Sequence, residues 1–234
     1  MAKCPLCNGS GREFVKGIHP ITKMEKLDVK WCLCKKSAYI SYKYPLLAML
    51  GDVYMPLDKV DKNLVFLRND LAKSPNLLIK GTPFWTFCHH IKSTFMKYHF
   101  MAPEPSMTVI KAYDILKKYY VEQVDGTSPQ LADLNRFDLL VFTLDTKQKN
   151  DKLNTCIHEV IYNRLCACIP TWIYLPNGMS FENTREYSDE LKAILKPDSK
   201  EETDRYKKVS LEEIATDSKP VENKVQRKAE DFRP

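Results

Sequence analysis

The chain has 234 residues, of which 44% are hydrophobic and 28% charged, enough for one medium-sized domain with a small satellite domain or a tail. No apolar run approaches the roughly 20 residues of a membrane-spanning helix, and the first residues lack the apolar segment of a secretory signal, so we expect a cytoplasmic protein with no membrane partner. The net charge of +6 is matched by residues 1–43 alone, which hold nine basic and three acidic residues; this favours nucleic acid or an acidic protein face as partner, although a solvated lysine-rich surface would explain it equally well.

The clearest motif is a set of two closely spaced cysteine pairs, Cys4-x2-Cys7 and Cys32-x-Cys34. In a reducing compartment, pairs of this spacing are typical of metal sites rather than disulfides. Zinc takes four thiolate or imidazole ligands in a tetrahedron, and the 24 residues between the pairs are enough for a hairpin with arms at 12–16 and 27–31. We therefore predict a structural Zn²⁺ site with four protein ligands and no open position for catalysis, and we expect His19 to be a bystander.

After an aromatic connector at residues 37–57, strand-like and helix-like segments alternate along the chain. Apolar spacing predicts helices at residues 58–72, 86–100, 112–123, 151–168 and 186–195. Short apolar runs predict strands at residues 76–80, 106–110, 138–145 and 171–175. Continuous apolar strands separated by helices predict an α/β fold with a parallel sheet covered on both faces.

Composition divides the chain into three parts. Residues 1–45 form the zinc-binding module and connector, and residues 46–196 form the α/β domain. Residues 197–234 are charged and poor in large apolar side chains, which predicts a mostly disordered tail with at most a transient helix near 209–216.

A phosphate-binding loop is nearly present after the strand at 76–80. A working loop has the pattern G-x-x-x-x-G-K-[ST], in which backbone N–H groups and the lysine hold phosphate. The corresponding degenerate loop contains Gly81, Thr82, Pro83, Thr86, Phe87 and Cys88. Thr86 stands at the second glycine, Phe87 at the lysine and Cys88 at the Mg²⁺-binding hydroxyl, while Phe84 and Trp85 fall in the space that phosphates would cross. The other interpretation is that residues 81–83 are a simple turn with no ATPase ancestry.

A second departure lies at the end of the strand at 138–145. An ATPase needs acidic residues there to hold Mg²⁺ and activate water, but Thr143 and Leu144 occupy those positions and Asp145 follows too late. Both the phosphate-binding loop and the acidic strand end thus lack the residues that ATP chemistry needs. This pattern indicates an ATPase-like fold that no longer binds its cofactor.

The order of the motifs carries a family resemblance. Taken in sequence, CPLCNGSG…WCLCKK, NLLIKGTP, SMTVIKAYDILKKYY, RFDLLVF and IHEVIYNRLCACIPTWIYLPN resemble bacterial and phage replicative-helicase loaders of the DnaC/DnaI type. These are AAA+ P-loop ATPases, many of which have an N-terminal helicase-binding zinc domain. The resemblance covers about residues 4–195, and its most specific parts are the cysteine-containing head and the segment 161–175. It implies an AAA+-like fold and a replicative helicase or other replisome protein as partner.

The departures from this family concern its ATP site. Family members bind ATP through the residues that correspond to Phe87 and Cys88, so we expect neither ATP binding nor ATPase activity. The family's sensor residue corresponds to Pro176 or Asn177. Arg164 matches a family arginine that can act across a subunit boundary, although a solvated arginine or one paired with an acid explains it as well.

The leading hypothesis is a phage- or plasmid-type replication accessory protein, a helicase-loader-like adaptor that binds a replicative helicase, DNA or both without using ATP. One alternative is an active ATPase with an atypical site that uses Lys80 and Asp145. Another is a zinc-ribbon nucleic-acid-binding regulator.

Three further groups of residues invite functional interpretations. The first interleaves aromatic and basic side chains and would suit single-stranded DNA or docking on a helicase: Lys35, Lys36, Tyr39, Tyr42, Lys43 and Tyr44. The second contains aromatic residues that we expect to fill the vacated nucleotide cavity, with a partner surface as the alternative: Phe84, Trp85, Phe87, Phe95, Tyr98 and Phe100. The third contains histidines for which helical spacing argues against a metal site: His89, His90 and His99.

Overall fold

The fold was analysed in a computed structural model of the chain. The structure describes residues 4, 6–18, 20–51, 57–101, 104–125, 131–144, 150–176, 187–195 and 206–211. No helix in this part of the chain combines the length and apolar content that crossing a lipid bilayer requires.

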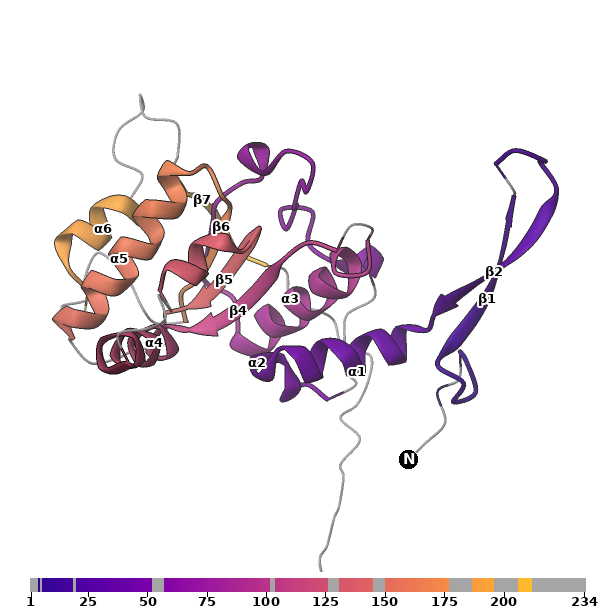
Figure 1. Cartoon of the computed structure of the whole chain (residues 1–234), viewed down its shortest axis with the longest axis horizontal. Helices are drawn as coiled ribbons and strands as arrows, with labels where there is room; N and C mark the ends of the chain where they lie inside the picture. Colours follow the sequence, from indigo (N-terminus) through magenta and orange to yellow (C-terminus); the bar gives the residue numbers. More distant parts are fainter. Residues whose placement is uncertain are drawn as a thin grey trace, which may run out of the picture.

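A five-stranded parallel sheet forms the centre of the body (Figure 1). Its strands are β3 (Leu77–Ile79), β4 (Met107–Lys111), β5 (Leu139–Thr143), β6 (Thr171–Tyr174) and β7 (Lys207–Val209). They are arranged in the order β4-β5-β6-β3-β7, and every neighbouring pair is parallel. Every residue of β3, β5 and β6 is buried, as expected for strands covered on both faces.

Helices cover both faces of the sheet and create two apolar cores. The core on one face includes residues of α1 (Leu33–Lys43), α2 (Pro45–Ala48) and α3 (Phe84–Tyr98). The core on the other face includes residues of α4 (Ala112–Asp125), α5 (Asp151–Cys166) and α6 (Asp189–Leu195). Short 3₁₀ turns occur at Leu57–Lys59, Leu71–Lys73 and Ala132–Arg136. The predicted α/β class, with a parallel sheet covered by helices on both faces, is thus confirmed. Strand β3, which precedes the degenerate loop, lies between β6 and β7.

The N-terminal module extends away from this body (Figure 1). Strands β1 (Arg12–Ile18) and β2 (Glu25–Trp31) form an antiparallel hairpin, close to the predicted arms. The cysteine-containing base of the hairpin leads directly into α1, so the predicted connector begins as a helix. Ile40 of α1 is fully buried in the core that α1 shares with α2 and α3, and α1 therefore belongs to both the N-terminal module and the body.

Two predictions about secondary structure are wrong. The segment 58–72 is not an α-helix; within it the structure places only turns and the 3₁₀ segments, because Leu64 and Phe66 are held in the core by an irregular chain. The predicted disordered tail, residues 197–234, also contains an ordered segment. Residues 207–209, which overlap at Val209 with the segment 209–216 where a transient helix was expected, form strand β7 beside β3, and Tyr206, Val209 and Leu211 are buried. The α/β domain therefore extends to at least Leu211. The other residues of 197–234 lie outside the described part of the chain.

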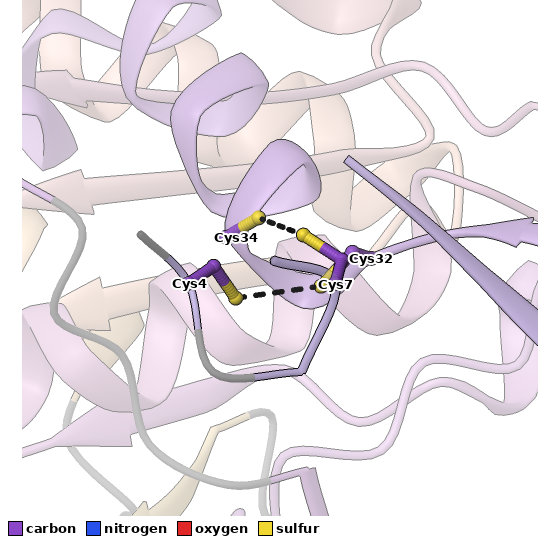
Figure 2. A group of neighbouring side chains, drawn as sticks. All are labelled: Cys4, Cys7, Cys32 and Cys34. Carbon is purple, nitrogen blue, oxygen red and sulfur yellow. Dashed lines mark hydrogen bonds between the residues drawn. The ribbon is translucent and has the colours of Figure 1, made fainter. Parts of the chain in front are cut away.

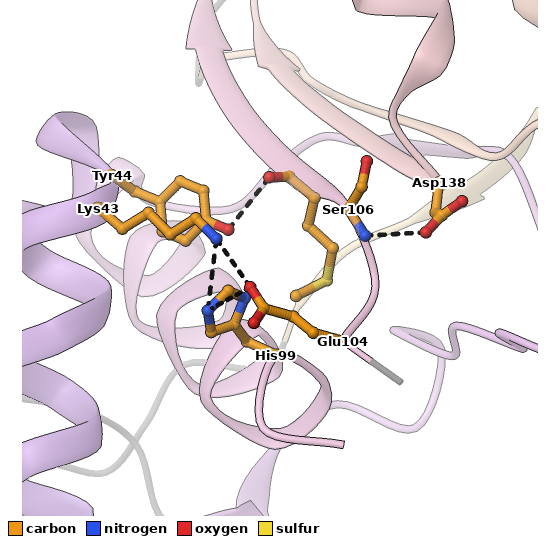
Figure 3. Close-up of polar contacts among 7 residues, drawn as sticks. Lys43, Tyr44, His99, Glu104, Ser106 and Asp138 are labelled. Carbon is orange, nitrogen blue, oxygen red and sulfur yellow. Dashed lines mark hydrogen bonds and ion pairs between the residues drawn. The ribbon is translucent and has the colours of Figure 1, made fainter. Parts of the chain in front are cut away.

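A polar joint connects α1 to the end of α3 (Figure 3). The ammonium of Lys43 lies 2.9 Å from Oε1 of Glu104, and Nε2 of His99 lies 2.9 Å from the same oxygen. Next to this group, the Tyr44 hydroxyl donates to the carbonyl of Met107 at the start of β4. These contacts fix the C-terminal end of α1 on the body.

Candidate functional site

The four N-terminal cysteines come together at the base of the hairpin (Figure 2). Their sulfur atoms all lie within 4.8 Å of one another, with 3.8 Å between Cys4 and Cys32 and 3.6 Å between Cys7 and Cys34. Around a tetrahedral zinc with Zn–S bonds of about 2.3 Å, neighbouring sulfurs lie about 3.8 Å apart. The donor set therefore fits a four-thiolate metal site. Among the described residues it is the one group of three or more Cys, His, Asp or Glu side chains whose ligand atoms lie close enough to hold one metal ion.

Backbone geometry explains why the sequence brings these sulfurs together. Asn8, Gly9 and Gly11 all have positive φ, which turns the chain tightly after Cys7. The N–H of Gly11 donates to the Cys7 sulfur at 3.3 Å, and the Gly11 carbonyl accepts from Cys32 N–H at 3.0 Å. A Cβ at residue 11 would meet only the flexible Lys35 side chain, at 3.0 Å, so it is the positive φ of +71° that favours glycine at this position.

The thiols of this cluster differ in acidity. Burial raises the pKa of Cys7, but hydrogen bonds from the backbone of Gly11 and Gly9 and from Cys34 outweigh it and lower that pKa to about 6. Burial and a hydrogen bond with Glu13 raise the pKa of Cys32. A bound cation would favour the thiolate form of all four side chains, because coordinated cysteine is deprotonated.

The degenerate loop at the carboxyl end of β3 is short and closed. Helix α3 begins at Phe84, only three residues after Gly81, so that Thr86, Phe87 and Cys88 already lie in its first two turns. Gly81 has φ +68, and its neighbour Thr82 is fully buried. The Thr82 hydroxyl accepts from the N–H of Leu211 at 2.9 Å. The segment after β7 therefore covers the loop.

Aromatic rings occupy the space beside this loop. Phe87 is fully buried and stacks on Tyr174 of β6, with ring centroids 4.2 Å apart and an interplanar angle of 16°. The Tyr174 hydroxyl donates to the Thr82 carbonyl at 2.8 Å, and Phe84 lies against the same ring. Burial raises the pKa of Tyr174 to about 12, so that its hydroxyl remains a proton donor.

The packing interpretation of the α3 aromatic residues is confirmed at three positions. Phe87, Phe95 and Tyr98 are buried in the core, whereas Trp85 is 55% exposed. Cys88 is also fully buried, and burial raises the pKa of its thiol to about 12. A neutral thiol within an apolar core is not placed to bind Mg²⁺.

The end of β5 carries the second departure. Thr143 and Leu144 are both fully buried, and the Thr143 hydroxyl has no hydrogen-bond partner among the described residues. Asp145 and Asn177 lie outside the described residues, as does His19. Pro176 is half-buried after β6. Lys80, whose side chain is the cation of the alternative ATPase hypothesis, is exposed, and its backbone N–H donates to the Val209 carbonyl.

Arg164 has a structural position that the sequence did not reveal. It is fully buried, and its guanidinium donates to the Thr171 hydroxyl at 2.9 Å. It also donates to three backbone carbonyls at 2.6–2.8 Å, those of Leu134, Phe137 and Pro170. Burial lowers the pKa of Arg164 to about 10, so that it remains charged. The expectations of a solvated or acid-paired side chain are wrong, and the enclosed guanidinium is not free to reach another subunit.

The tyrosines near α1 do not form a stacking platform. Tyr44 is 4% exposed, and Tyr39 stacks on His99 with ring centroids 5.3 Å apart. Tyr42 alone of the three is open to solvent, at 88% exposed. The histidines of α3 are not grouped for metal binding, since His90 Nδ1 accepts from the N–H of Asp61.

Two of the cavities in the described part of the body lie away from the degenerate loop. One, of about 220 Å³, lies between α4, the turn at Ala132–Arg136 and α5. The other, of about 330 Å³, lies between residues 66–70 and the end of α3. Neither is lined by residues of the degenerate loop.

The sequence matches no known family profile and no curated protein. Several solved structures are similar in fold. Domain III of the replication initiation protein DnaA from Thermotoga maritima is 14% identical, with a TM-score of 0.48, over 66% of this chain and 64% of that chain. DnaA from Aquifex aeolicus bound to AMPPCP is 11% identical, with a TM-score of 0.49, over 70% and 49%. A replication initiator DnaA bound to AMPPCP and single-stranded DNA is 9% identical, with a TM-score of 0.48, over 74% and 46%.

The chain spans less than two thirds of the length of each of these proteins. The likeness is one of fold, and it assigns no substrate, partner or activity to this chain.

Proposed function

We propose that the chain is a replication accessory protein, a helicase-loader-like adaptor that binds a replicative helicase or another replisome component without using ATP. The observation that carries this proposal is the stack of Phe87 on Tyr174 in a loop whose motif has lost its lysine. Where a phosphate-binding loop would present N–H groups and a cation, this loop presents packed rings and is covered by Leu211.

The head supplies the binding element of this proposal. We infer that its four sulfurs hold Zn²⁺, because four thiolates at tetrahedral spacing form a closed structural site. Four thiolates and Zn²⁺ carry a net charge of −2, which basic residues such as Lys35 and Lys36 offset. Bound zinc would fix the base of a basic hairpin beside α1. Binding is then mechanical: the metal holds a rigid head and the sheet provides its support.

The partner is tested by affinity purification of the tagged full-length chain from its natural host, with mass spectrometry of the recovered proteins. A Cys4→Ser variant serves as the control. We expect a replicative helicase or another replisome protein to be recovered with the wild-type chain and to be reduced at least tenfold with the variant. Recovery that does not depend on Cys4 would refute the role of the head.

The nucleotide part of the proposal has its own test. Purified chain is titrated with a fluorescent ATP analogue and Mg²⁺, and its ATP-dependent self-assembly is followed by light scattering. We expect no saturable binding at micromolar nucleotide. Saturable binding that is lost in a Lys80→Ala variant would support the active-ATPase alternative instead.

The charge of the head favours a second candidate function, nucleic-acid-binding regulation by a zinc ribbon. Residues 1–43 carry a net charge of +6. This candidate predicts DNA affinity that falls steeply as salt is added, together with no recovery of a helicase.

A further inference from the structure

The hairpin has one apolar face that is open to solvent. In an antiparallel pair, directly opposite residues lie on the same face, and successive residues alternate between faces. The register therefore places five apolar side chains together on one face, where they are 42–68% exposed: Phe14, Ile18, Leu27, Val29 and Trp31. The hairpin tip adds Ile21 and Met24, at 84% and 67% exposed. We call these seven side chains the hairpin face.

The other side of the hairpin is mostly polar. Lys26 and Asp28 form an ion pair at 3.1 Å, and Glu13 lies opposite Lys30. The hairpin is thus amphipathic. At its base, Trp31 packs against the rings of Tyr39 and Phe100, with centroids 6.2 and 5.4 Å away, but the rest of the apolar side contacts solvent instead of a core. A two-stranded hairpin is marginally stable alone, and contiguous exposed apolar patches mark interaction sites. The cysteine cluster and the ring contacts of Trp31 at its base explain how the hairpin is held in place.

The composition of the hairpin face indicates what covers it. Five of its seven side chains have no aromatic ring, so they offer no stacking surface for bases, which argues for protein rather than single-stranded nucleic acid. The apolar side chains on β1 alternate with Arg12 and Lys16, whereas Glu25 is the one acidic residue on this face of the paired strands. If a second copy of this chain bound here, its own Arg12 and Lys16 would face Arg12 and Lys16 of the first copy and repel them. Charge complementarity therefore favours an acidic partner.

The arrangement also indicates how the partner binds. Strand addition at an edge would leave the apolar side chains exposed, because they point out of the face and not along the edge. A helix laid across the face would cover them. Seven residue pairs at about 3.3 Å each extend roughly 23 Å, the length of a helix of about 15 residues.

We propose that the hairpin face binds an amphipathic α-helix of a protein partner, with the apolar stripe of that helix flanked by acidic residues. This deepens the adaptor function proposed above and rests on it for the identity of the partner protein.

The test uses the zinc-loaded full chain and two fluorescein-labelled 15-residue peptides with leucines at helical spacing, one with glutamate and the other with lysine at the remaining positions. Fluorescence anisotropy is expected to show at least tenfold tighter binding of the glutamate peptide, weakening as salt is added. The variant Phe14→Ser/Leu27→Ser should bind it at least tenfold more weakly. Tyr162→Ser, which removes a 53% exposed ring from α5, is the matched control and should bind like the wild type.

A charge swap sharpens the test. Arg12→Glu/Lys16→Glu should reverse the preference from the glutamate to the lysine peptide. Zinc content and circular dichroism of each variant verify that the head remains folded. Equal binding of both peptides by the wild type, or no loss in Phe14→Ser/Leu27→Ser, would overturn the proposal. The proposal would also be overturned if the wild type dimerised with increasing concentration, or bound a 20-nucleotide single strand of DNA, and Phe14→Ser/Leu27→Ser lost that behaviour.

The two proposals fail separately. If the glutamate peptide binds at the hairpin face but no replisome protein is recovered from the host, the face is assigned correctly and the replication function is wrong. If a helicase is recovered equally well by Phe14→Ser/Leu27→Ser, the replication function holds and the assignment of the face is wrong.

Discussion

Replacing Phe87 by alanine tests whether the loop after β3 is filled by well-packed rings. Its side chain is fully buried, so the substitution removes the transfer free energy of the ring and leaves a cavity, which together cost about 3–5 kcal/mol. Loss of the stack on Tyr174 adds about 0.5–1.5 kcal/mol, placing the expected value in the upper half of that range. Trp85→Ala, two residues earlier on the same helix, is the control. Because that ring is 55% exposed, we expect its loss to cost less than about 1 kcal/mol.

The assay is equilibrium unfolding in urea, with zinc and a reducing agent present and the slope of the transition compared among the variants. If Phe87→Ala lies within about 1 kcal/mol of Trp85→Ala, the rings are loosely held and the argument for a closed pocket is refuted. Phe87→Ala should also gain no ATP binding, because the cavity would still lack the lysine of a working loop.

The remaining predictions concern other parts of the molecule. Arg164→Met should lower the free energy of unfolding by about 3–5 kcal/mol in urea titrations, because it removes the guanidinium donor from the carbonyls of Leu134, Phe137 and Pro170, of which Pro170 keeps only a 3.4 Å bond from the N–H of Leu140; Arg164→Lys should not fully rescue it. A Cys7→Ser variant should lose bound zinc in elemental analysis while the far-ultraviolet circular dichroism of the α/β body is retained; full zinc stoichiometry would contradict the site. Burial lowers the pKa of His99 below its ordinary 6.5, so the unfolded chain takes up the proton first. Stability should therefore fall as pH drops below about 6.5, and less so in His99→Gln, as measured by thermal unfolding across that range.

The central sheet and its main helices could be predicted because their physics is local. Strands such as β5 and β6 are buried on both sides and form continuous apolar runs, and α3, α4 and α5 show helical spacing between them. The cysteine pairs were equally informative, because metal coordination restricts both residue type and spacing.

The parts that sequence reasoning missed depend on distant partners. Strand β7 is only three residues long with two exposed lysines, and what makes it a strand is its pairing with β3. The carbonyls that hold Arg164 come from turns that no local pattern places beside it. In the segment 58–72, apolar residues at helical spacing were misleading because Leu64 and Phe66 are buried by contacts with the body and not along one helix face. The hairpin face was missed because the arms were predicted only as supports for a metal site.

The pairing of β3 with β7 has a consequence for synthesis on the ribosome. Leu77 pairs with Lys207, so one side of β3 has no strand beside it while most of the chain is still being made. Until residues 206–211 emerge, the open edge can recruit another nascent chain, as unpaired strands do. Production at low temperature or with a chaperone that shields that edge should therefore increase soluble yield, and a reading frame shortened before Tyr206 should aggregate.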